Sequence, residues 1–276
     1  MRKVATVLCL VVLALAVVGG VSALSPSSAH ADGPRYTVLQ MNLCLSGQAG
    51  CYPRTSYPSV VDEAAAQVVD RDAGAVTLNE VCSGDAAMIA RRTGYEMRFA
   101  AVLLAGEPLP CVDPRGRGVF GLAVLTRDGI TTAHDQAFAV QAGAEQRRWM
   151  CVTTDRPVTV CTAHLSTPES AAARRVNDAE CRELRGVLAQ YDAAATTVFG
   201  GDVNRQAPCA PPTMWATADA SATQAPGIQH IYGSTSLAEP AARVVPATYT
   251  DHDFFLTASR LSPPGDRQRL TISPLR

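Results

Sequence analysis

The stretch of sequence that decides the fold is Thr196-Thr-Val-Phe-Gly-Gly-Asp-Val-Asn204. Its β-branched and aromatic residues predict a short strand that ends at two glycines, where the backbone can turn tightly and approach another group closely. Asp202 and Asn204 are two positions apart, so in an extended segment their side chains leave on the same face. A carboxylate beside an amide at a strand end suits a Mg²⁺-bound phosphate. An ordinary Gly-Asp turn with an Asx cap is the alternative, and this stretch alone leaves both open.

The N-terminal residues have the pattern of a secretory signal peptide. Two basic residues precede an apolar run over 4–18, and Ala29-His30-Ala31 supplies small residues at the spacing of a cleavage site. A transmembrane anchor is the alternative, but the run is short and two glycines interrupt it. We therefore predict a signal peptide at 1–31, a secreted single domain at 32–276, and no stable membrane insertion after cleavage.

Export makes the cysteines informative. One of the nine cysteines lies in the predicted signal peptide, and the remaining even set indicates disulfide bonds in an exported chain. Spacing alone cannot choose among about 105 pairings of eight cysteines. Zinc is discounted, because no two cysteines have the short gap of a zinc knuckle. Joining sequence neighbours predicts the pairs Cys44–Cys51, Cys82–Cys111, Cys151–Cys161 and Cys181–Cys209.

The charge is too balanced for a protein that binds its partner by electrostatics alone. The sequence has 24 basic and 25 acidic residues, and two of the basic residues lie in the predicted signal peptide. The mature chain therefore carries a net charge of about −3, whereas a protein held on nucleic acid by charge alone would be strongly basic.

Strands and helices alternate early in the chain, and hairpins follow later. This order predicts a mixed sheet with helices outside it. Residues 105–118 are predicted to form a loop, as is the Pro- and Thr-rich region that ends at Gly227. Helices are predicted over 59–72, 85–92 and 169–190, and strands over 35–42, 75–80, 95–104, 119–126, 149–154, 158–164, 228–232, 248–256 and 270–272, in addition to the strand of the opening stretch.

Five polar residues occupy strand ends in this scheme: Asn42, Glu80, His164, Asp202 and His252. In mixed α/β proteins, functional sites gather in the loops at strand ends. Each residue alone has an ordinary explanation, since a strand-terminal Asn is usually a turn former and a lone His is usually structural. Five of them in one chain predict a functional site at one rim of the sheets.

Five short motifs follow one another along the chain: Met41-Asn42-Leu43, Leu78-Asn79-Glu80-Val81, Thr162-Ala163-His164-Leu165, Gly201-Asp202-Val203-Asn204 and Thr250-Asp251-His252. Their order and spacing resemble the endonuclease/exonuclease/phosphatase superfamily, which has the DNase I-like fold, over nearly all of the mature chain. The resemblance implies an α+β fold, a four-layer α/β/β/α sandwich with two mixed β-sheets packed face to face. It also implies Mg²⁺-dependent hydrolysis of a phosphoester, with Mn²⁺ or Ca²⁺ as alternatives.

Chemistry and the resemblance assign the same roles on the metal side. Glu80 is a hard oxygen ligand for a divalent cation, with Asn42 nearby on the metal or the phosphate and Asp251 on the metal side. His252 is the candidate general base, because imidazole titrates near neutral pH.

The remaining residues of the motifs are assigned to the phosphate and the attacking water. His164 is expected to hydrogen-bond a phosphoryl oxygen and stabilise the charge that develops there. Asp202 and Asn204 are expected to orient the nucleophilic water and bind the phosphate, while the metal acts as a Lewis acid for in-line attack.

Two residues depart from the superfamily pattern. Asn79 stands where Gln is usual, which is a small change. Gln229 stands where an acidic residue usually partners the general-base histidine, and an amide stabilises imidazolium less. Either turnover is reduced or Asp253 or His230 compensates, and restoring the acid with Gln229→Asp is expected to raise turnover. Glu145-Gln-Arg147 also resembles an acidic-x-Arg motif of the superfamily, without an assigned role.

These features favour a secreted Mg²⁺-dependent phosphodiesterase, in particular a nuclease acting on DNA or RNA as a monomer. A sphingomyelinase-like enzyme would need an exposed aromatic hairpin, and the sequence has no dense aromatic patch. An inositol phosphate or nucleotide phosphatase is a further alternative. A catalytically weak binding module is a different class altogether, favoured only by Gln229.

Overall fold

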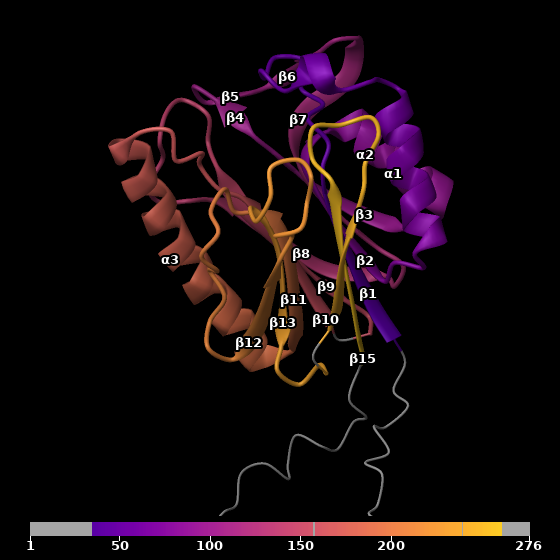
Figure 1. Ribbon diagram of the computed structural model, residues 1–276, viewed down its shortest axis with the longest axis vertical. Coiled ribbons are helices and arrows are strands. Elements are labelled where there is room, and N and C mark those ends of the chain that lie inside the picture. Colours follow the sequence, from indigo (N-terminus) through magenta and orange to yellow (C-terminus); the bar gives the residue numbers. More distant parts are fainter. Residues whose placement is uncertain (1–34, 157, 239, 261–276) are drawn as a thin grey trace, which may run out of the picture. The chain divides into compact units, whose positions relative to one another are not determined.

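Two large mixed β-sheets pack face to face in the residues that the computed structural model describes, 35–156, 158–238 and 240–260 (Figure 1). The first sheet has the strand order β14-β15-β1-β2-β7-β3, with β6 beside β7. Its strands are β1 (Arg35–Asn42), β2 (Ala75–Cys82), β3 (Glu96–Ala101), β6 (Pro110–Val112), β7 (Arg115–Thr126), β14 (Ala241–Val245) and β15 (Phe254–Arg260).

The second sheet has the order β12-β13-β11-β10-β9-β8. Each sheet contains one parallel pair, β1 with β2 in the first and β10 with β11 in the second. A short hairpin of β4 (Leu103–Leu104) and β5 (Glu107–Pro108) stands apart from both. The strands of the second sheet are β8 (Ile130–Ala137), β9 (Arg148–Thr154), β10 (Val158–His164), β11 (Thr196–Asp202), β12 (Met214–Ala218) and β13 (Gln229–Ser234).

Helices cover the outer face of each sheet, which gives four layers (Figure 1). Helices α1 (Ser59–Asp70) and α2 (Ser83–Thr93) bury apolar residues at helical spacing against the first sheet. Helix α3 (Ala171–Ala194) follows the N-cap residue Ser170, whose hydroxyl accepts from the Ala173 backbone N–H, and packs Leu184 and Leu188 against the second sheet. The predicted α/β/β/α sandwich and its three helices are confirmed.

Apolar side chains from both sheets form the layer between them. Val38 of the first sheet, for example, lies in one buried cluster with Val160 and Val198 of the second. Burial of this layer holds the two sheets together but is non-directional, so it does not by itself fix how the strand ends align.

The structure of residues 196–204, the stretch quoted at the start of the sequence analysis, differs from the prediction at the two glycines. Strand β11 continues through Gly200 and Gly201 to Asp202, so the predicted turn at the two glycines is wrong. The predicted close approach is confirmed, because a Cβ added to Gly200 would lie 2.2 Å from Thr77 Oγ1 of the facing sheet. A Cβ on Gly201 would lie 2.5 Å from the carbonyl oxygen of Ala163. Only glycine fits at these two positions.

Most strands missed by the sequence analysis lie at sheet edges. The predicted loop 105–118 contains β5, β6 and the start of β7, and β12 lies inside the second predicted loop. Strands β8 and β14 were not predicted, because both are mostly exposed and show no alternating apolar pattern. The strand predicted over 248–256 begins only at Phe254, and residues 248–252 form a loop instead. The strand predicted over 270–272 and the predicted signal peptide lie outside the described residues.

The four predicted disulfide bonds are confirmed: Cys44–Cys51, Cys82–Cys111, Cys151–Cys161 and Cys181–Cys209. The first closes the loop after β1, and the third joins the neighbouring strands β9 and β10. Among the described helices, none is both long and apolar enough to cross a membrane.

Removing the Cys181–Cys209 bond should lower the free energy of unfolding by roughly 3–4 kcal/mol, because that bond closes a long loop in the unfolded chain. The shorter Cys151–Cys161 loop should give a smaller loss, roughly 2–3 kcal/mol. Equilibrium denaturant unfolding of Cys181→Ala/Cys209→Ala and Cys151→Ala/Cys161→Ala, each against wild type, measures both. Eight titratable thiols in the native protein would contradict the pairing altogether.

Candidate active site

The two parallel strand pairs bring their carboxyl ends to the same rim of the sandwich. Asn42, His164 and Asp202 end β1, β10 and β11, and Glu80 lies near the end of β2, which continues to Cys82. The Asn42 amide nitrogen donates to Glu80 Oε1 at 2.9 Å and to Asp202 Oδ2 at 3.0 Å, so it bridges carboxylates of the two sheets. His252 joins them from the loop before β15, with Nε2 3.5 Å from Asp202 Oδ2. All five predicted strand-end residues therefore meet.

A bulge in β2 aims Glu80 at this rim. The pairing of β2 with β7 shifts register between Leu78 and Val81, and Glu80 has φ +52°. A positive φ is strained for a residue other than glycine, at a cost of about 1–3 kcal/mol, and such strain concentrates at functional sites. The bulge turns the Glu80 side chain out of the alternation of the strand and toward Asn42 and His164.

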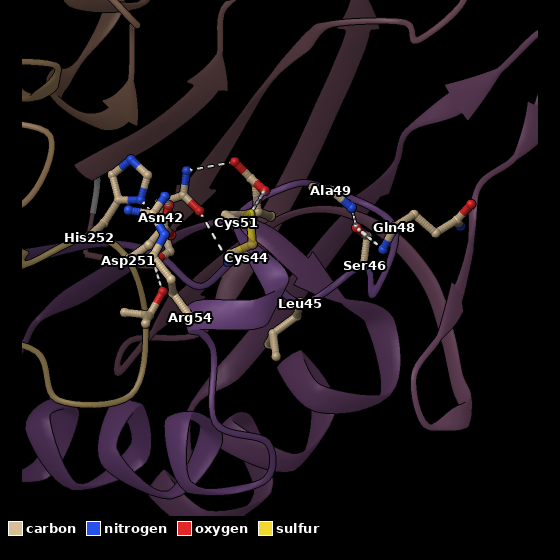
Figure 2. Close-up of a disulfide and its surroundings, with 12 residues drawn as sticks. Asn42, Cys44, Leu45, Ser46, Gln48, Ala49, Cys51, Arg54, Asp251 and His252 are labelled. Carbon is tan, nitrogen blue, oxygen red and sulfur yellow. Dashed lines mark hydrogen bonds and ion pairs between the residues drawn. A yellow bond between two sulfur atoms is a disulfide. The ribbon is translucent and has the colours of Figure 1, made fainter.

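One oxygen of the Glu80 carboxylate has no N–H or O–H donor in the described part of the chain. Oε1 accepts from Asn42, whereas the contact of Oε2 is Cys51 Sγ at 3.7 Å (Figure 2). Cys51 is bonded to Cys44 and carries no thiol proton, so it cannot donate. Burial raises the pKa of Glu80, and the nearby Asp202 charge acts in the same direction, against the Asn42 hydrogen bond. A partly unsatisfied carboxylate beside a second one fits a hard divalent cation.

The Asn42 side chain is oriented to hydrogen-bond the Glu80 and Asp202 carboxylates, and not to coordinate a metal ion itself. Both of its amide contacts to Glu80 and Asp202 come from the nitrogen, while its oxygen accepts from the Cys44 backbone N–H at 3.2 Å. In this orientation no Asn42 oxygen faces Glu80, so the predicted role of Asn42 on the metal or the phosphate finds no direct geometric support.

The tautomer of His164 follows from its neighbour. Arg147 Nη1 lies 2.7 Å from His164 Nδ1, and a guanidinium can only donate, so Nδ1 accepts and the proton of the neutral ring sits on Nε2. Burial, followed by the Arg147 and His252 charges, lowers the pKa of His164 well below its ordinary value. His164 is therefore a neutral donor whose Nε2 lies 3.8 Å from Glu80 Oε1 and 3.9 Å from Asp202 Oδ2.

His252 has the opposite environment. Burial, the largest single influence, lowers its pKa, but the hydrogen bond to Asp251 and the charges of Asp202, Asp251 and Glu80 outweigh it and raise the pKa to about 9. Asp251 Oδ1 lies 2.9 Å from His252 Nδ1, and Asp251 Oδ2 accepts from Arg54 at 3.0 Å (Figure 2). Without a cation, His252 is thus positively charged at neutral pH.

The predicted partnership of Gln229 with His252 is wrong, and Asp251 takes that place. The Gln229 side-chain nitrogen donates to the Asp253 carbonyl oxygen at 2.5 Å and to Asp219 Oδ2 at 3.3 Å. Asp251, predicted on the metal side, has its two carboxylate oxygens directed at His252 and Arg54 instead. An acidic partner for His252 is therefore present, but from the neighbouring position in sequence.

The side chains of the two residues named as substitute partners, Asp253 and His230, bond to groups other than the His252 imidazole. The Asp253 carboxylate accepts from the backbone N–H groups of Thr223 and Ala247. His230 Nδ1 pairs with the Tyr232 hydroxyl at 2.8 Å. Both residues stabilise loops and strands near the site, which is a structural role.

Asp202 and Asn204 form the Asx turn named as the alternative for the opening stretch, and Asp202 also lies at the rim of the candidate site. The Asn204 backbone N–H donates to Asp202 Oδ1 at 3.0 Å, which is the Asx interaction of an ordinary turn. Asn204 lies past the end of β11 with φ +51°, and its amide donates to the Leu165 carbonyl oxygen. Asp202 Oδ2 nevertheless faces Asn42 and both site histidines, so one carboxylate serves the turn and the site.

Several residues near the site escaped prediction. Arg54 gave no signal in the sequence, whereas Arg147 stood in a noted motif and now has a partner, His164. Asn79 was treated as a minor change, yet its side-chain oxygen accepts from the Asp202 backbone N–H at 2.7 Å and from Gln40 at 2.8 Å. Interactions between residues so far apart in sequence leave no local pattern.

Comparisons with known proteins identify the fold. No protein-family model matches the sequence. No curated protein sequence matches it either. Among solved structures, an endonuclease/exonuclease/phosphatase from Beutenbergia cavernae superposes with a TM-score of 0.63 at 20% identity, covering 83% of this chain and 72% of that one.

Two eukaryotic structures are similar as well. The human Nocturnin catalytic domain with bound sulfate gives a TM-score of 0.63 at 13% identity, covering 83% of this chain and 94% of that one. D. rerio TDP2 complexed with a single-strand DNA product gives a TM-score of 0.57 at 12% identity, covering 82% of this chain and 99% of that one. The chain therefore has the endonuclease/exonuclease/phosphatase, or DNase I-like, fold, as the resemblance of its motifs implies.

The protonation of His252 leads to a testable pH dependence. Because its folded pKa of about 9 lies above the value of about 6.5 in the unfolded chain, its stabilising contribution is complete below about pH 6.5 and is lost as the pH rises through 9. We expect the free energy of unfolding in chelator to fall across that window. NMR titration of the imidazole should show the high pKa, and Asp251→Asn should lower it by about 1–3 units. An equal pKa near 6.5 in both proteins would contradict the pairing.

Restoring the acid at position 229 should not activate the protein. Gln229→Asp removes the amide that donates to Asp253 and places a second buried carboxylate beside Asp219, whose pKa burial already raises to about 6. We expect a loss of about 1–3 kcal/mol in unfolding free energy and no gain in turnover. The exposed Gln206→Asp serves as the control. A faster Gln229→Asp protein of unchanged stability would show that position 229 does act on His252.

Proposed function

We propose that the chain is a secreted, divalent-metal-dependent phosphodiesterase that cleaves nucleic acid by attack of water in line with the leaving group. The observation that carries the proposal is the meeting of Glu80, Asp202, His164 and His252 at one rim, with separations of 3.5 to 3.9 Å between histidine nitrogens and carboxylate oxygens. Two carboxylates and two histidines in opposite protonation states suit phosphoester hydrolysis better than a structural role.

Glu80 is the proposed principal ligand of the cation. Its Oε2 is free of donors in the described part of the chain, and Asn42 keeps it beside Asp202. Mg²⁺ is the proposed ion, with Mn²⁺ or Ca²⁺ as alternatives, because the donors are hard oxygens. When bound, the ion would polarise a phosphoryl oxygen and neutralise charge in the transition state.

His252 and Asp202 are proposed to act on the attacking water. Their facing atoms lie 3.5 Å apart, so a water beside them can donate to both groups. Asp251 fixes the ring through Nδ1 and stabilises the imidazolium that forms when Nε2 takes the proton. This role needs His252 to be neutral before the step, which the positive charge of a cation at Glu80 favours.

His164 is proposed to donate to a phosphoryl oxygen. Its neutral Nε2–H points to the same rim as Glu80 and Asp202, and Arg147 keeps the proton on that nitrogen. A fixed donor stabilises the charge that grows on the phosphate without reorganising during the reaction. Asn204 contributes by holding Asp202 and the Leu165 carbonyl in position, with a contact to the phosphate as a further proposed role.

The cellular context and the substrate are also proposals. Four disulfide bonds are typical of proteins in oxidising compartments, which supports export after removal of residues 1–31. The single-strand DNA product bound to D. rerio TDP2 supports a nucleic acid as the substrate class. The protein is proposed to act as a monomer.

The substrate proposal is tested by one panel of assays. Plasmid DNA, RNA, sphingomyelin, an inositol phosphate, a nucleotide and a generic phosphodiester are each incubated with the mature protein, with Mg²⁺ and with excess chelator. Cleavage of DNA or RNA only in the presence of metal supports the proposal. Hydrolysis of sphingomyelin or of a monoester alone would assign a lipid phosphodiesterase or a phosphatase instead, and inactivity on every substrate would leave a binding module.

Two substitutions test the assigned chemistry. Glu80→Gln should raise the Mg²⁺ concentration needed for half-maximal activity, because it removes the charge of the proposed ligand, whereas the exposed Glu107→Gln should not. His252→Ala should lower turnover by roughly 10²–10⁴, the usual contribution of general-base catalysis. Steady-state kinetics over a Mg²⁺ series measure both. Full activity in excess chelator, or an active His252→Ala protein, would remove the corresponding role.

A further inference from the structure

The Cys44–Cys51 disulfide lies directly beside the proposed metal ligand. Cys51 Sγ is 3.7 Å from Glu80 Oε2, and the two sulfurs and a Glu80 oxygen lie within 4.8 Å of one another (Figure 2). In the disulfide form the sulfurs are neutral and bonded to each other, so they offer no thiolate ligand. Once the bond is reduced, Cys44 and Cys51 offer two thiols, which together with the Glu80 carboxylate make a different set of metal ligands.

This disulfide is also the one most open to reduction. Cys51 is partly exposed, whereas the other seven cysteines of the four bonds are buried. The bond closes the shortest loop of the four, with a sequence separation of 7, so it constrains the unfolded chain least. An external reductant therefore reaches this bond at the lowest cost to the fold.

The backbone around both cysteines is held independently of the disulfide. On one side of Cys44, the Leu43 N–H donates to the Asn79 carbonyl oxygen, and on the other the Leu45 N–H donates to the Glu80 carbonyl oxygen. Beyond Cys51, Arg54 donates from its backbone to the Cys51 carbonyl oxygen and from its side chain to Asp251. Both sulfurs therefore stay close to Glu80 after the bond is broken.

We propose that Cys44, Cys51 and Glu80 form a zinc-binding site when the disulfide is reduced. Two thiolates and a carboxylate are a donor set that zinc accepts, and thiolates select zinc over Mg²⁺. With Zn–S of about 2.3 Å and Zn–O of about 2.1 Å, tetrahedral geometry separates ligand sulfur and oxygen by about 3.6 Å. The observed separation of 3.7 Å between Cys51 Sγ and Glu80 Oε2 is close to that value. The two sulfurs, which are bonded to each other in the oxidised form, would move to about 3.8 Å apart around the ion. The fourth position is left for water.

The chemistry balances with a dithiol as the reductant. A dithiol transfers two electrons to the Cys44–Cys51 bond, becomes a disulfide itself, and leaves two protein thiols. Zinc then displaces the two thiol protons to solvent and binds the thiolates. An external disulfide reoxidises the pair by accepting its two electrons and, with two protons from solvent, becomes a dithiol, so the zinc is released and the hard-oxygen site at Glu80 is restored.

The consequence for activity rests on the proposed function. Glu80 cannot serve zinc in the thiolate site and Mg²⁺ in the catalytic site in the same geometry, so zinc inhibits the reduced enzyme. The oxidised enzyme keeps the Mg²⁺ site and is inhibited much less. Zinc inhibition of the reduced form thereby restricts hydrolysis to oxidising surroundings, which is where an exported phosphodiesterase would act.

The test measures metal binding directly. The mature protein is reduced with a phosphine under native conditions, the phosphine is removed, and Cd²⁺ is added as a spectroscopic stand-in for zinc. We expect a thiolate-to-cadmium charge-transfer band that saturates at one equivalent per reduced chain and is absent from the oxidised protein. Alkylation and peptide mapping should place the new thiols at Cys44 and Cys51. Zinc in large molar excess should displace the cadmium and abolish the band, the excess being needed because cadmium is the softer ion and binds thiolates more tightly.

Two variants make the result specific. Cys44→Ser/Cys51→Ser retains the other three disulfides and should show no band after the same treatment. Glu80→Gln should weaken cadmium binding by at least about tenfold, which thiols in an unfolded chain would not show. A band in the double serine variant, or equal affinity in Glu80→Gln, overturns the proposal. So does a reduced protein with free Cys44 and Cys51 thiols that binds no cadmium.

Activity assays separate this proposal from the proposed function. Zinc should inhibit the reduced wild type at least about tenfold more strongly than the oxidised wild type, and reduction should not sensitise the double serine variant to zinc. If the oxidised protein hydrolyses no phosphoester, the proposed function fails while the cadmium band still decides the metal site. If hydrolysis is normal and the band is absent, only the zinc site fails.

Discussion

The hydrogen bond from the Asp202 backbone N–H to Asn79 Oδ1, 2.7 Å long, joins the two sheets beneath the site. The apolar layer between the sheets is non-directional and would tolerate small shifts of one sheet against the other. A buried hydrogen bond does not tolerate such shifts, because breaking it leaves a donor and an acceptor buried without a partner. Glu80 follows Asn79 in sequence, so the bond that holds Asn79 on Asp202 also brings the two carboxylates of the site together.

The close approach of the two sheets explains the glycine at position 200, and the hydrogen bonding of buried polar groups explains the amide at position 229. Gly200 has no side chain because Thr77 of the facing sheet occupies that space, and Thr77 donates to Gln40, which in turn donates to Asn79. Gln229 belongs to the same buried network through Gln40. Beside the Asp219 carboxylate an amide can donate, whereas a second carboxylate would repel, so an amide is the residue that this position needs.

The sequence predicted what depends on local pattern. Buried strands such as β1, β2 and β10, the three helices, and the strand-end residues Glu80 and His164 all follow from periodicity, turn residues and motif order. Edge strands such as β8 were missed, because an exposed strand needs no apolar alternation. The partner of His252 was missed for another reason. Which acid reaches an imidazole depends on loop conformation, and residues 248–252 form a loop where a strand was predicted.

The two histidines show how one residue type acquires two chemical states within a few ångströms. Each ring presents Nε2 to Asp202, at 3.9 Å for His164 and 3.5 Å for His252. They differ at Nδ1, where His164 meets the Arg147 guanidinium and His252 meets the Asp251 carboxylate. A cation at Nδ1 excludes a proton there and keeps the ring neutral, whereas an anion stabilises the imidazolium. The difference in protonation between the two imidazoles therefore comes from Arg147 and Asp251, which contact the rings on the side away from Asp202.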